Sequence, residues 1–188
     1  MMESFHSIKD VIMGEINEAL SKVDEESVGR LAEDIICSDK VFLTGVGRVF
    51  MSLQAFTKRL SHLGVDAHCV GDITEPAFTD KSLLIVGSGS GCSIVPVAIA
   101  KKAKEFNGKV VHIGSNPNGD VAKYVDYMVR IPVRTRLYLD DETNSKQPMT
   151  ALFEQCLLLF GDIVSMQIIE KKQVEDLKIL WMYHANLE

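Results

Sequence analysis

Residues 83–106, LLIVGSGSGCSIVPVAIAKKAKEF, contain the pattern that decides the fold. Four apolar residues predict a buried strand, the seven small residues 87–93 predict a turn, and residues 94–106 predict a helix. A continuous apolar strand followed at once by a helix is typical of a parallel sheet covered on both faces. The stretch therefore predicts one repeating unit of an α/β fold.

The same alternation continues on both sides of this unit. We expect strands at 41–44, 67–70, 82–86, 109–113 and 127–133, and helices at 48–63, 120–125 and 149–171. Two further helices are expected within 1–37, and a short helix and a tail after 171. The prediction is a three-layer, doubly wound, five-stranded parallel sheet flanked by helices, in one domain spanning 1–188.

Composition limits the classes of function. Hydrophobic residues make up 46% of the 188 residues and charged residues 24%, which suits a globular protein with a real core. The net charge of −6 disfavours a nucleic-acid partner but allows a small anionic ligand. No apolar run reaches the ~18 residues of a membrane span, and residues 1–26 lack a signal-peptide pattern, so we expect a cytoplasmic protein with no membrane partner. Four scattered cysteines without a CxxC pair predict neither a disulfide framework nor a zinc site.

Two glycine-rich turns follow predicted strands, at 45–48 and at 87–93. Ligands of doubly wound sheets bind beyond the carboxyl ends of the strands, and helix N-termini there suit phosphate. The hydroxyls of Ser88, Ser90 and Ser93 add donors, so the second turn is expected to hold a phosphate group. The alternative is a serine-rich connection in which Ser93 caps the helix.

Nucleotide-binding motifs fit these turns poorly. Residues 87–93 contain no lysine and so do not form a GxxxxGK[ST] phosphate loop. The stretch 45–50 begins as a dinucleotide fingerprint, but Phe50 occupies its last glycine position. The acidic residue about 20 positions on, Asp66, falls near the start of a strand, the wrong end for a ribose.

Both turns resemble those of the sugar isomerase (SIS) domain family, whose serine turn usually reads SGSGET and here reads SGSGCS (88–93). Residues 45–64 and 110–126 are similar to its first strand and helix and to its fourth strand and following turn. The segment QPMTALFEQ (147–155) and the terminal HANLE (184–188) resemble the 6-phospho-3-hexuloisomerases. The similarity extends over nearly the whole chain.

The resemblance implies interconversion of D-arabino-hex-3-ulose 6-phosphate and fructose 6-phosphate, through an enediolate. It places the chain in formaldehyde assimilation by the ribulose monophosphate pathway, or in the reverse direction for pentose supply. It also implies a homotetramer without cofactor or metal, in which 1–37 and 149–188 supply oligomer or active-site elements. A non-catalytic sugar-phosphate sensor and an isomerase of another phosphosugar remain alternatives, although the N-terminal helices carry no concentrated basic face.

The site residues follow from motif positions. Glu154 is the expected base that removes the C2 proton, and the alternative for it is a solvated helix glutamate. His184 is the second catalytic candidate, as a proton shuttle between sugar oxygens, and the alternative for it is a frayed terminus. His62 is expected to bind substrate or to serve the helix end. The sequence leaves open whether each histidine acts in the site of its own or of a neighbouring subunit. Gly47 and Arg48 in the first turn are expected to bind the substrate. His112 carries no expectation beyond packing.

Three positions depart from the family pattern. Val49 stands where serine is common, Cys92 replaces the Glu of SGSGET, and Ser93 replaces its Thr. Val49 removes a hydroxyl and Cys92 removes a carboxylate, whereas Ser93 keeps a donor. Packing is the expected role of Cys92, and the departures leave open a reduced activity or a shifted substrate.

Overall fold

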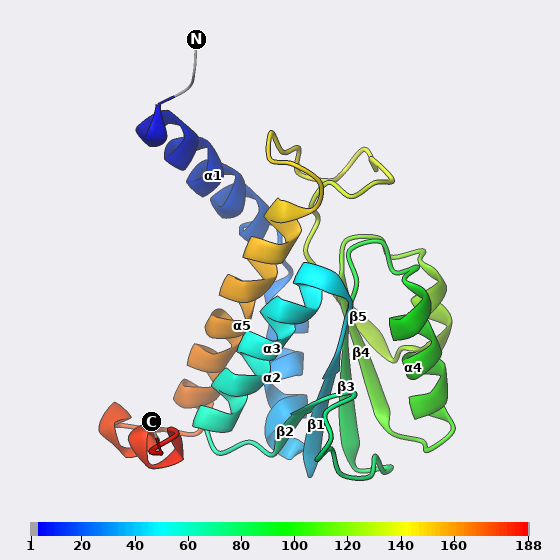
Figure 1. The fold of residues 1–188 in the computed structure, drawn as a ribbon, viewed down its shortest axis with the longest axis vertical. Coiled ribbons are helices and arrows are strands. Elements are labelled where there is room, and N and C mark those ends of the chain that lie inside the picture. Colours follow the sequence, from blue (N-terminus) through cyan, green and yellow to red (C-terminus); the bar gives the residue numbers. More distant parts are fainter. Residues whose placement is uncertain (1–3, 188) are drawn as a thin grey trace.

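Five parallel strands form one sheet in the order β2-β1-β3-β4-β5 (Figure 1). The computed structural model describes residues 4–187, so the ends of the predicted N-terminal helices and C-terminal tail, 1–3 and 188, lie outside the described residues. The strands are β1 (Lys40–Thr44), β2 (Ala67–Cys69), β3 (Ser82–Gly87), β4 (Lys109–Gly114) and β5 (Tyr127–Arg130). The helices are α1 (Phe5–Leu20), α2 (Glu25–Cys37), α3 (Gly47–His62), α4 (Ile94–Lys104), η1 (Asp120–Tyr124), α5 (Ala151–Lys171) and η2 (Leu177–Tyr183). The predicted α/β fold is confirmed.

Helices cover both faces of the sheet. Helices α2, α3 and α5 lie on one face, and α4 with η1 lies on the other (Figure 1). Side chains alternate between two buried clusters, as the pleat of a strand requires. In β3, Leu83 and Ile85 pack toward α5, whereas Leu84 and Val86 pack toward α4. Both faces of β3 are therefore buried, which explains its uninterrupted apolar sequence.

The order of the strands creates a switch point between β1 and β3. From β1 the chain moves outward to β2 and then returns to the other side of β1, where β3 pairs with it in parallel. The connection after β1 therefore runs toward β2, whereas the connection after β3 runs in the opposite direction toward β4. The turns that begin these two connections diverge at the carboxyl ends of β1 and β3. In such folds ligands bind in the region where these connections diverge, which is called the crevice below, and the two glycine-rich turns lie at this region.

Strand β5 is shorter than expected. It ends at Arg130 instead of Val133 because the following residues bond to a loop. Ile131 N–H still donates to Gly114 O at 2.8 Å, but Pro132 lacks an N–H, and its carbonyl accepts from Thr143 N–H at 2.7 Å. The loop 134–147 is thereby tied to the end of the sheet.

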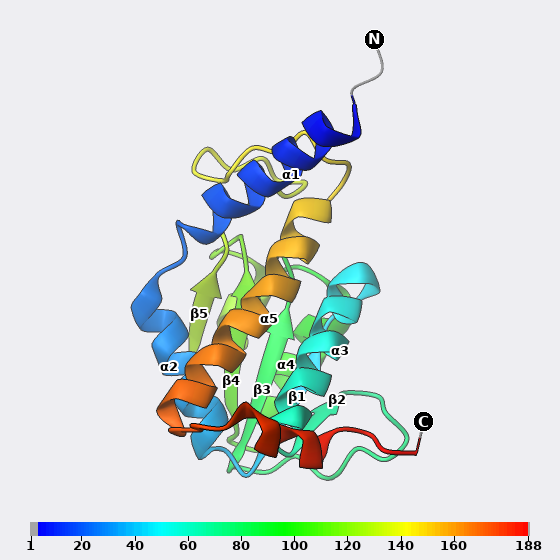
Figure 2. The ribbon, with the colours of Figure 1, turned by 90° about the vertical axis from the view of Figure 1, so that its left-hand side faces the viewer.

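Helix α5 crosses the α2–α3 face and carries α1 at its N-terminal end (Figure 2). By length and composition alone α5 could cross a membrane, but 56% of its apolar window is buried inside the protein. Its buried side chains include Phe153, Phe160 and Val164, which belong to the main cluster. These observations describe the core helix of a globular fold.

Candidate functional site

The serine turn after β3 presents hydroxyls and backbone donors at the switch point. Ser88 Oγ lies 3.2 Å from Ser93 Oγ, and Ser88 Oγ accepts from Gly91 N–H at 3.1 Å. Ser90 Oγ accepts from Cys92 N–H at 3.3 Å. Within residues 4–187, the N–H groups of Gly89 and Ser90 have no hydrogen-bond acceptor. Unused N–H groups beside hydroxyls form a cradle for an anion.

The N-terminus of α4 points its dipole at the same turn. Ser93 is the N-cap residue, but its hydroxyl makes no capping hydrogen bond, so the alternative role of a capping serine is not seen. Its hydroxyl instead meets that of Ser88. Ile94 and Val95, the first residues of α4, have N–H groups that a helix leaves without internal partners. A phosphate at the turn would therefore meet the positive end of α4.

Glu154 lies in the first turn of α5. It is 8% exposed, so it is not a solvated helix glutamate. Its Oε2 accepts from Arg48 Nε, and its Oε1 accepts from Thr150 Oγ1 at 2.8 Å. Its backbone carbonyl accepts from Ser52 Oγ at 2.8 Å, which joins α3 to α5. The carboxylate is thus held in one orientation, next to a cation.

Packing brings this carboxylate's helix against the serine turn. A methyl group added to Gly89 would lie 3.5 Å from the Phe153 ring and 3.5 Å from Thr135 Cγ2. Phe153 directly precedes Glu154, and Arg48 follows Gly47, which begins α3 with a φ of +58°. Elements from three distant parts of the chain therefore converge on one crevice: the turn after β1, the turn after β3 and the start of α5.

His62 and His184 lie together at the far end of α3. Their rings stack with centroids 5.0 Å apart, and Trp181 lies 5.1 Å from His184. Burial lowers the pKa of His62, assisted by Lys58 and His184. His62 lies fourteen positions after Arg48 in the same helix, a rise of about 21 Å. Within one chain, these histidines do not meet Glu154.

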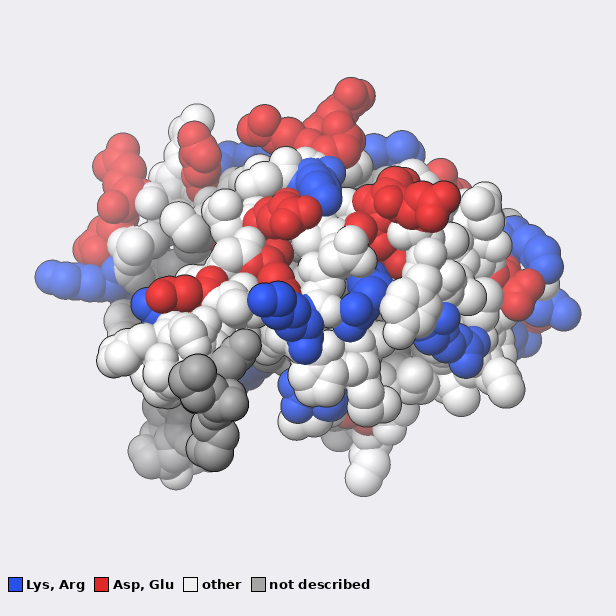
Figure 3. All heavy atoms as spheres, turned by 90° about the horizontal axis from the view of Figure 1, so that it is seen from above, with Lys and Arg blue, Asp and Glu red and all other residues white. Residues whose placement is uncertain are grey.

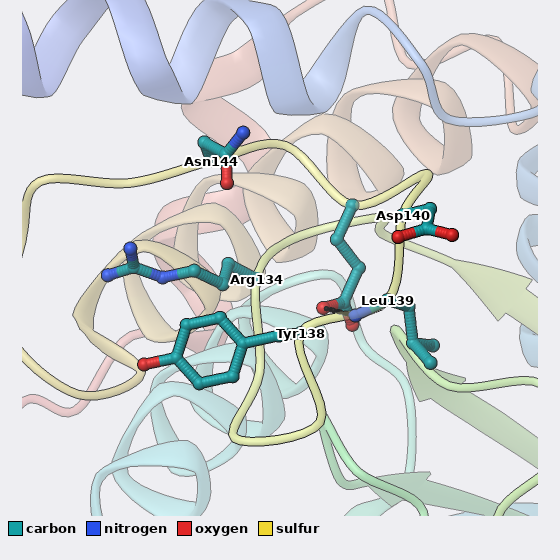
Figure 4. A pocket seen from close by; sticks show the side chains of 6 residues that line it. Arg134, Tyr138, Leu139, Asp140 and Asn144 are labelled. Atoms are coloured by element: carbon teal, nitrogen blue, oxygen red, sulfur yellow. Dashed lines mark hydrogen bonds between the residues drawn. The ribbon is translucent and has the colours of Figure 1, made fainter.

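The loop 134–147 overhangs the edge of the sheet and contains a small cavity. The cavity of about 190 Å³ is lined by Arg134, Tyr138, Leu139, Asp140, Glu142 and Asn144 (Figure 4). Arg134 lies 5.5 Å from the centre of the Tyr138 ring, and the two side chains extend side by side. The buried Glu142 carboxylate organises the loop, because it accepts from Ser115 Oγ at 2.8 Å and from the N–H groups of Thr135 and Leu139 at 3.0 Å.

Seen from above, this edge of the molecule carries Lys and Arg side chains beside Asp and Glu side chains (Figure 3). The mixture suits a local anion site on an acidic protein better than an extended nucleic-acid surface. Across residues 4–187, the structure contains no group of three or more His, Cys, Asp or Glu side chains that could hold a metal ion.

Sequence reasoning missed several residues of this site. Thr150, the N-cap residue of α5, and Ser52 of α3 orient Glu154, and neither hydroxyl stands out in the sequence. His112, 1% exposed on β4, donates from Nε2 to Ser88 O at 2.8 Å. A histidine within an otherwise apolar strand was the available signal for it.

Comparison with known proteins agrees with this architecture. The SIS domain matches residues 34–159, and the chain belongs to the SIS domain family. More narrowly, it is 36% identical to the 3-hexulose-6-phosphate isomerase of Bacillus subtilis, over 94% of this chain and 95% of that protein. It is 34% identical to the isomerase of the same name from Mycobacterium gastri, over 95% and 88%. The family predicted from the serine turn and the C-terminal motifs is confirmed.

A solved structure extends the agreement to three dimensions. A Methanococcus jannaschii protein, whose crystal structure infers a function of 3-hexulose-6-phosphate isomerase, superposes with a TM-score of 0.82. It is 30% identical in sequence, and the match covers 97% of this chain and 99% of that one. The matched region includes α1, α5 and η2, which lie wholly or partly outside the SIS match.

Proposed function

We propose that this chain is a phosphosugar isomerase that interconverts D-arabino-hex-3-ulose 6-phosphate and fructose 6-phosphate. The observation that carries the proposal is the buried Glu154 carboxylate, which Arg48 and Thr150 hold at the start of α5, next to the contact of Phe153 with Gly89 of the serine turn. The similarity to proteins named 3-hexulose-6-phosphate isomerase supports the choice of substrate.

In the proposed mechanism, the phosphate binds at the serine turn. Ser88, Ser90 and Ser93 supply hydroxyls, and Gly89 and Ser90 supply N–H groups. Hydrogen bonds to a charged group contribute about 1.5–3 kcal/mol each, so the phosphate provides most of the affinity. The sugar carbons then extend toward Glu154.

Glu154 is the proposed base. It removes the proton from C2 of the hex-3-ulose, and the electrons of that C–H bond form the C2–C3 double bond of an enediolate. Glu154 then delivers a proton to C3, while the hydroxyl proton of O2 moves to O3, which leaves the carbonyl at C2. Arg48, whose side chain is 66% exposed, keeps Glu154 oriented and offers its remaining N–H groups to the sugar oxygens.

His62 and His184 are proposed to act in the site of a neighbouring subunit. They lie far from Glu154 of their own chain, and the buried Nε2 of His62 has no partner among the described residues. Large apolar side chains are exposed around them and along two helices. They include Phe5, Ile8 and Met13 of α1, Leu158, Ile163 and Met166 of α5, and Leu177, Ile179, Trp181 and Met182 of η2. Exposure of this extent favours contacts between subunits, and we propose the homotetramer that the family resemblance implies.

One assay tests the proposal. Purified protein is given fructose 6-phosphate and an aldolase that cleaves hex-3-ulose 6-phosphate, and formaldehyde release is followed. Formaldehyde release that depends on this chain supports the isomerase. We propose that the isomerase acts in the ribulose monophosphate pathway, in the cytoplasm. Binding of fructose 6-phosphate without release would identify a sugar-phosphate sensor instead, and turnover of a different phosphosugar would redefine the substrate.

A further inference from the structure

The carbonyl groups of Ser88, Gly89 and Ser90 all accept hydrogen bonds from β4 or the loop after it. Gly89 O accepts from the N–H groups of Ser115 and Asn116, each at 3.0 Å. Ser90 O accepts from Asn116 Nδ2 at 2.9 Å. Ser88 O accepts the turn's own bond from Gly91 N–H at 3.2 Å and a second, shorter bond from His112 Nε2 at 2.8 Å. Strand β4 and the loop after it therefore anchor the turn from behind.

The direction of each carbonyl sets the direction of the next N–H. A trans peptide is planar, and its C=O and N–H point to opposite sides. Fixing the Ser88 carbonyl toward His112 thus aims the Gly89 N–H into the crevice. Glycine offers little resistance to rotation of this peptide, so the bond from His112 is needed to select one orientation.

The surroundings of His112 are shaped for this contact. His112 and Gly114 face the same side of β4, and a methyl group on Gly114 would overlap both His112 Nε2 and Ser88 O. The absence of a side chain at Gly114 lets the imidazole reach the carbonyl. Because Ser88 O can only accept, Nε2 must carry the hydrogen. Burial lowers the pKa of His112 to about 4, so the ring is neutral at physiological pH.

We infer that His112 is a positioning residue, which orients the Ser88–Gly89 peptide so that the serine turn presents its donors to phosphate. The inference rests on the proposed phosphate role of that turn. His112 touches neither the substrate nor the reacting carbons, and it acts through the turn alone.

Three variants test the inference. His112→Phe keeps the size of the ring but removes the donor and leaves the Ser88 carbonyl with one partner. We expect its dissociation constants for inorganic phosphate and for fructose 6-phosphate, measured by calorimetry, to rise about tenfold, with KM rising more than kcat falls. His112→Gln places an amide N–H near the position of Nε2 and should restore both constants to within about threefold of the wild type. The control is Val110→Ala, on the same face of β4 two residues earlier, which should lower Tm without changing either constant.

Two further measurements need no ligand. Amide hydrogen exchange at residues 88–92 should be faster in His112→Phe and near normal in His112→Gln. Nitrogen NMR of wild-type histidines should show the Nε2-protonated tautomer for His112, so the test holds even if His112→Phe fails to fold. Unchanged exchange and affinity in His112→Phe, or the Nδ1-protonated tautomer in the wild type, would overturn the inference. A wild type that binds phosphate but does not isomerise would instead refute the proposed function and leave the role of His112 measurable.

Discussion

Replacement of Glu154 by glutamine is the sharpest test of the proposed base. The amide oxygen can accept from Arg48 or Thr150 as the carboxylate does, so the local geometry should persist. The amide cannot take the C2 proton. Proton transfer by a positioned side chain contributes ~10²–10⁴-fold, so kcat should fall at least ~100-fold. Affinity for fructose 6-phosphate should change little, because the proposed phosphate site lies on another element.

The same variant should fold normally. Its ion pair joins a buried carboxylate to an arginine that is mostly exposed, and such pairs contribute about 1 kcal/mol or less. For a domain of this size that corresponds to a change in Tm of ~2–4 °C. Glu170→Gln, an exposed glutamate near the end of the same helix, is the matched control and should keep full turnover.

Isotope exchange isolates the proton-transfer step. In deuterated water, Glu154→Gln should exchange the C2 hydrogen of hex-3-ulose 6-phosphate, or the C3 hydrogen of fructose 6-phosphate, more slowly, in parallel with its loss of turnover, because this exchange needs only the base. If turnover and exchange survive in Glu154→Gln but collapse in His184→Asn, the base lies in the tail and the two roles must be exchanged.

Three other outcomes are expected. The double variant Ser88→Ala/Ser90→Ala should bind fructose 6-phosphate at least tenfold more weakly by calorimetry, because each lost hydrogen bond to the phosphate contributes ~1.5–3 kcal/mol. Unchanged affinity would contradict the proposed phosphate site. Trp181, which is 70% exposed, should lie in a subunit contact, so light scattering should show a tetramer for the wild type and smaller species for Trp181→Ser, whereas a wild-type monomer at micromolar concentration would refute the assembly. The pKa of His112 is about 4 in the folded state and ~6.5 in the unfolded state. As pH falls, the unfolded state therefore takes up a proton at a higher pH than the folded state does, and stability is lost below pH 6.5. Chemical denaturation should show a loss of roughly 2 kcal/mol between pH 6.5 and pH 5 that is absent from His112→Gln.

The sequence alone determined the class of fold, because the signals for it are local. An apolar run such as 83–86 places apolar side chains on both faces of a strand. Both faces must then be buried, as they are in a parallel sheet covered by helices on each side. The small residues 87–93 allow a tight turn into a helix, and the carboxyl end of a parallel strand is where such a turn must lie. The phosphate role of Ser88 and Ser90 was predicted in the same way, since turn and donors are adjacent in the chain.

Tertiary structure alone decided which residues share the crevice. Glu154 and Arg48 are 106 positions apart, and their contact depends on how α5 packs against α3, which no local pattern encodes. The same packing places His62 and His184 together at the opposite end of α3, away from Glu154 of their own chain. In the sequence, His112 is only a polar residue in a predicted strand. The register of β4 against β3 and the missing side chain at Gly114 bring its ring to the Ser88 carbonyl. The sequence determines which chemical groups are present. The distance between two groups that are far apart in the chain depends on how helices and strands pack, and that packing exists only in the folded protein.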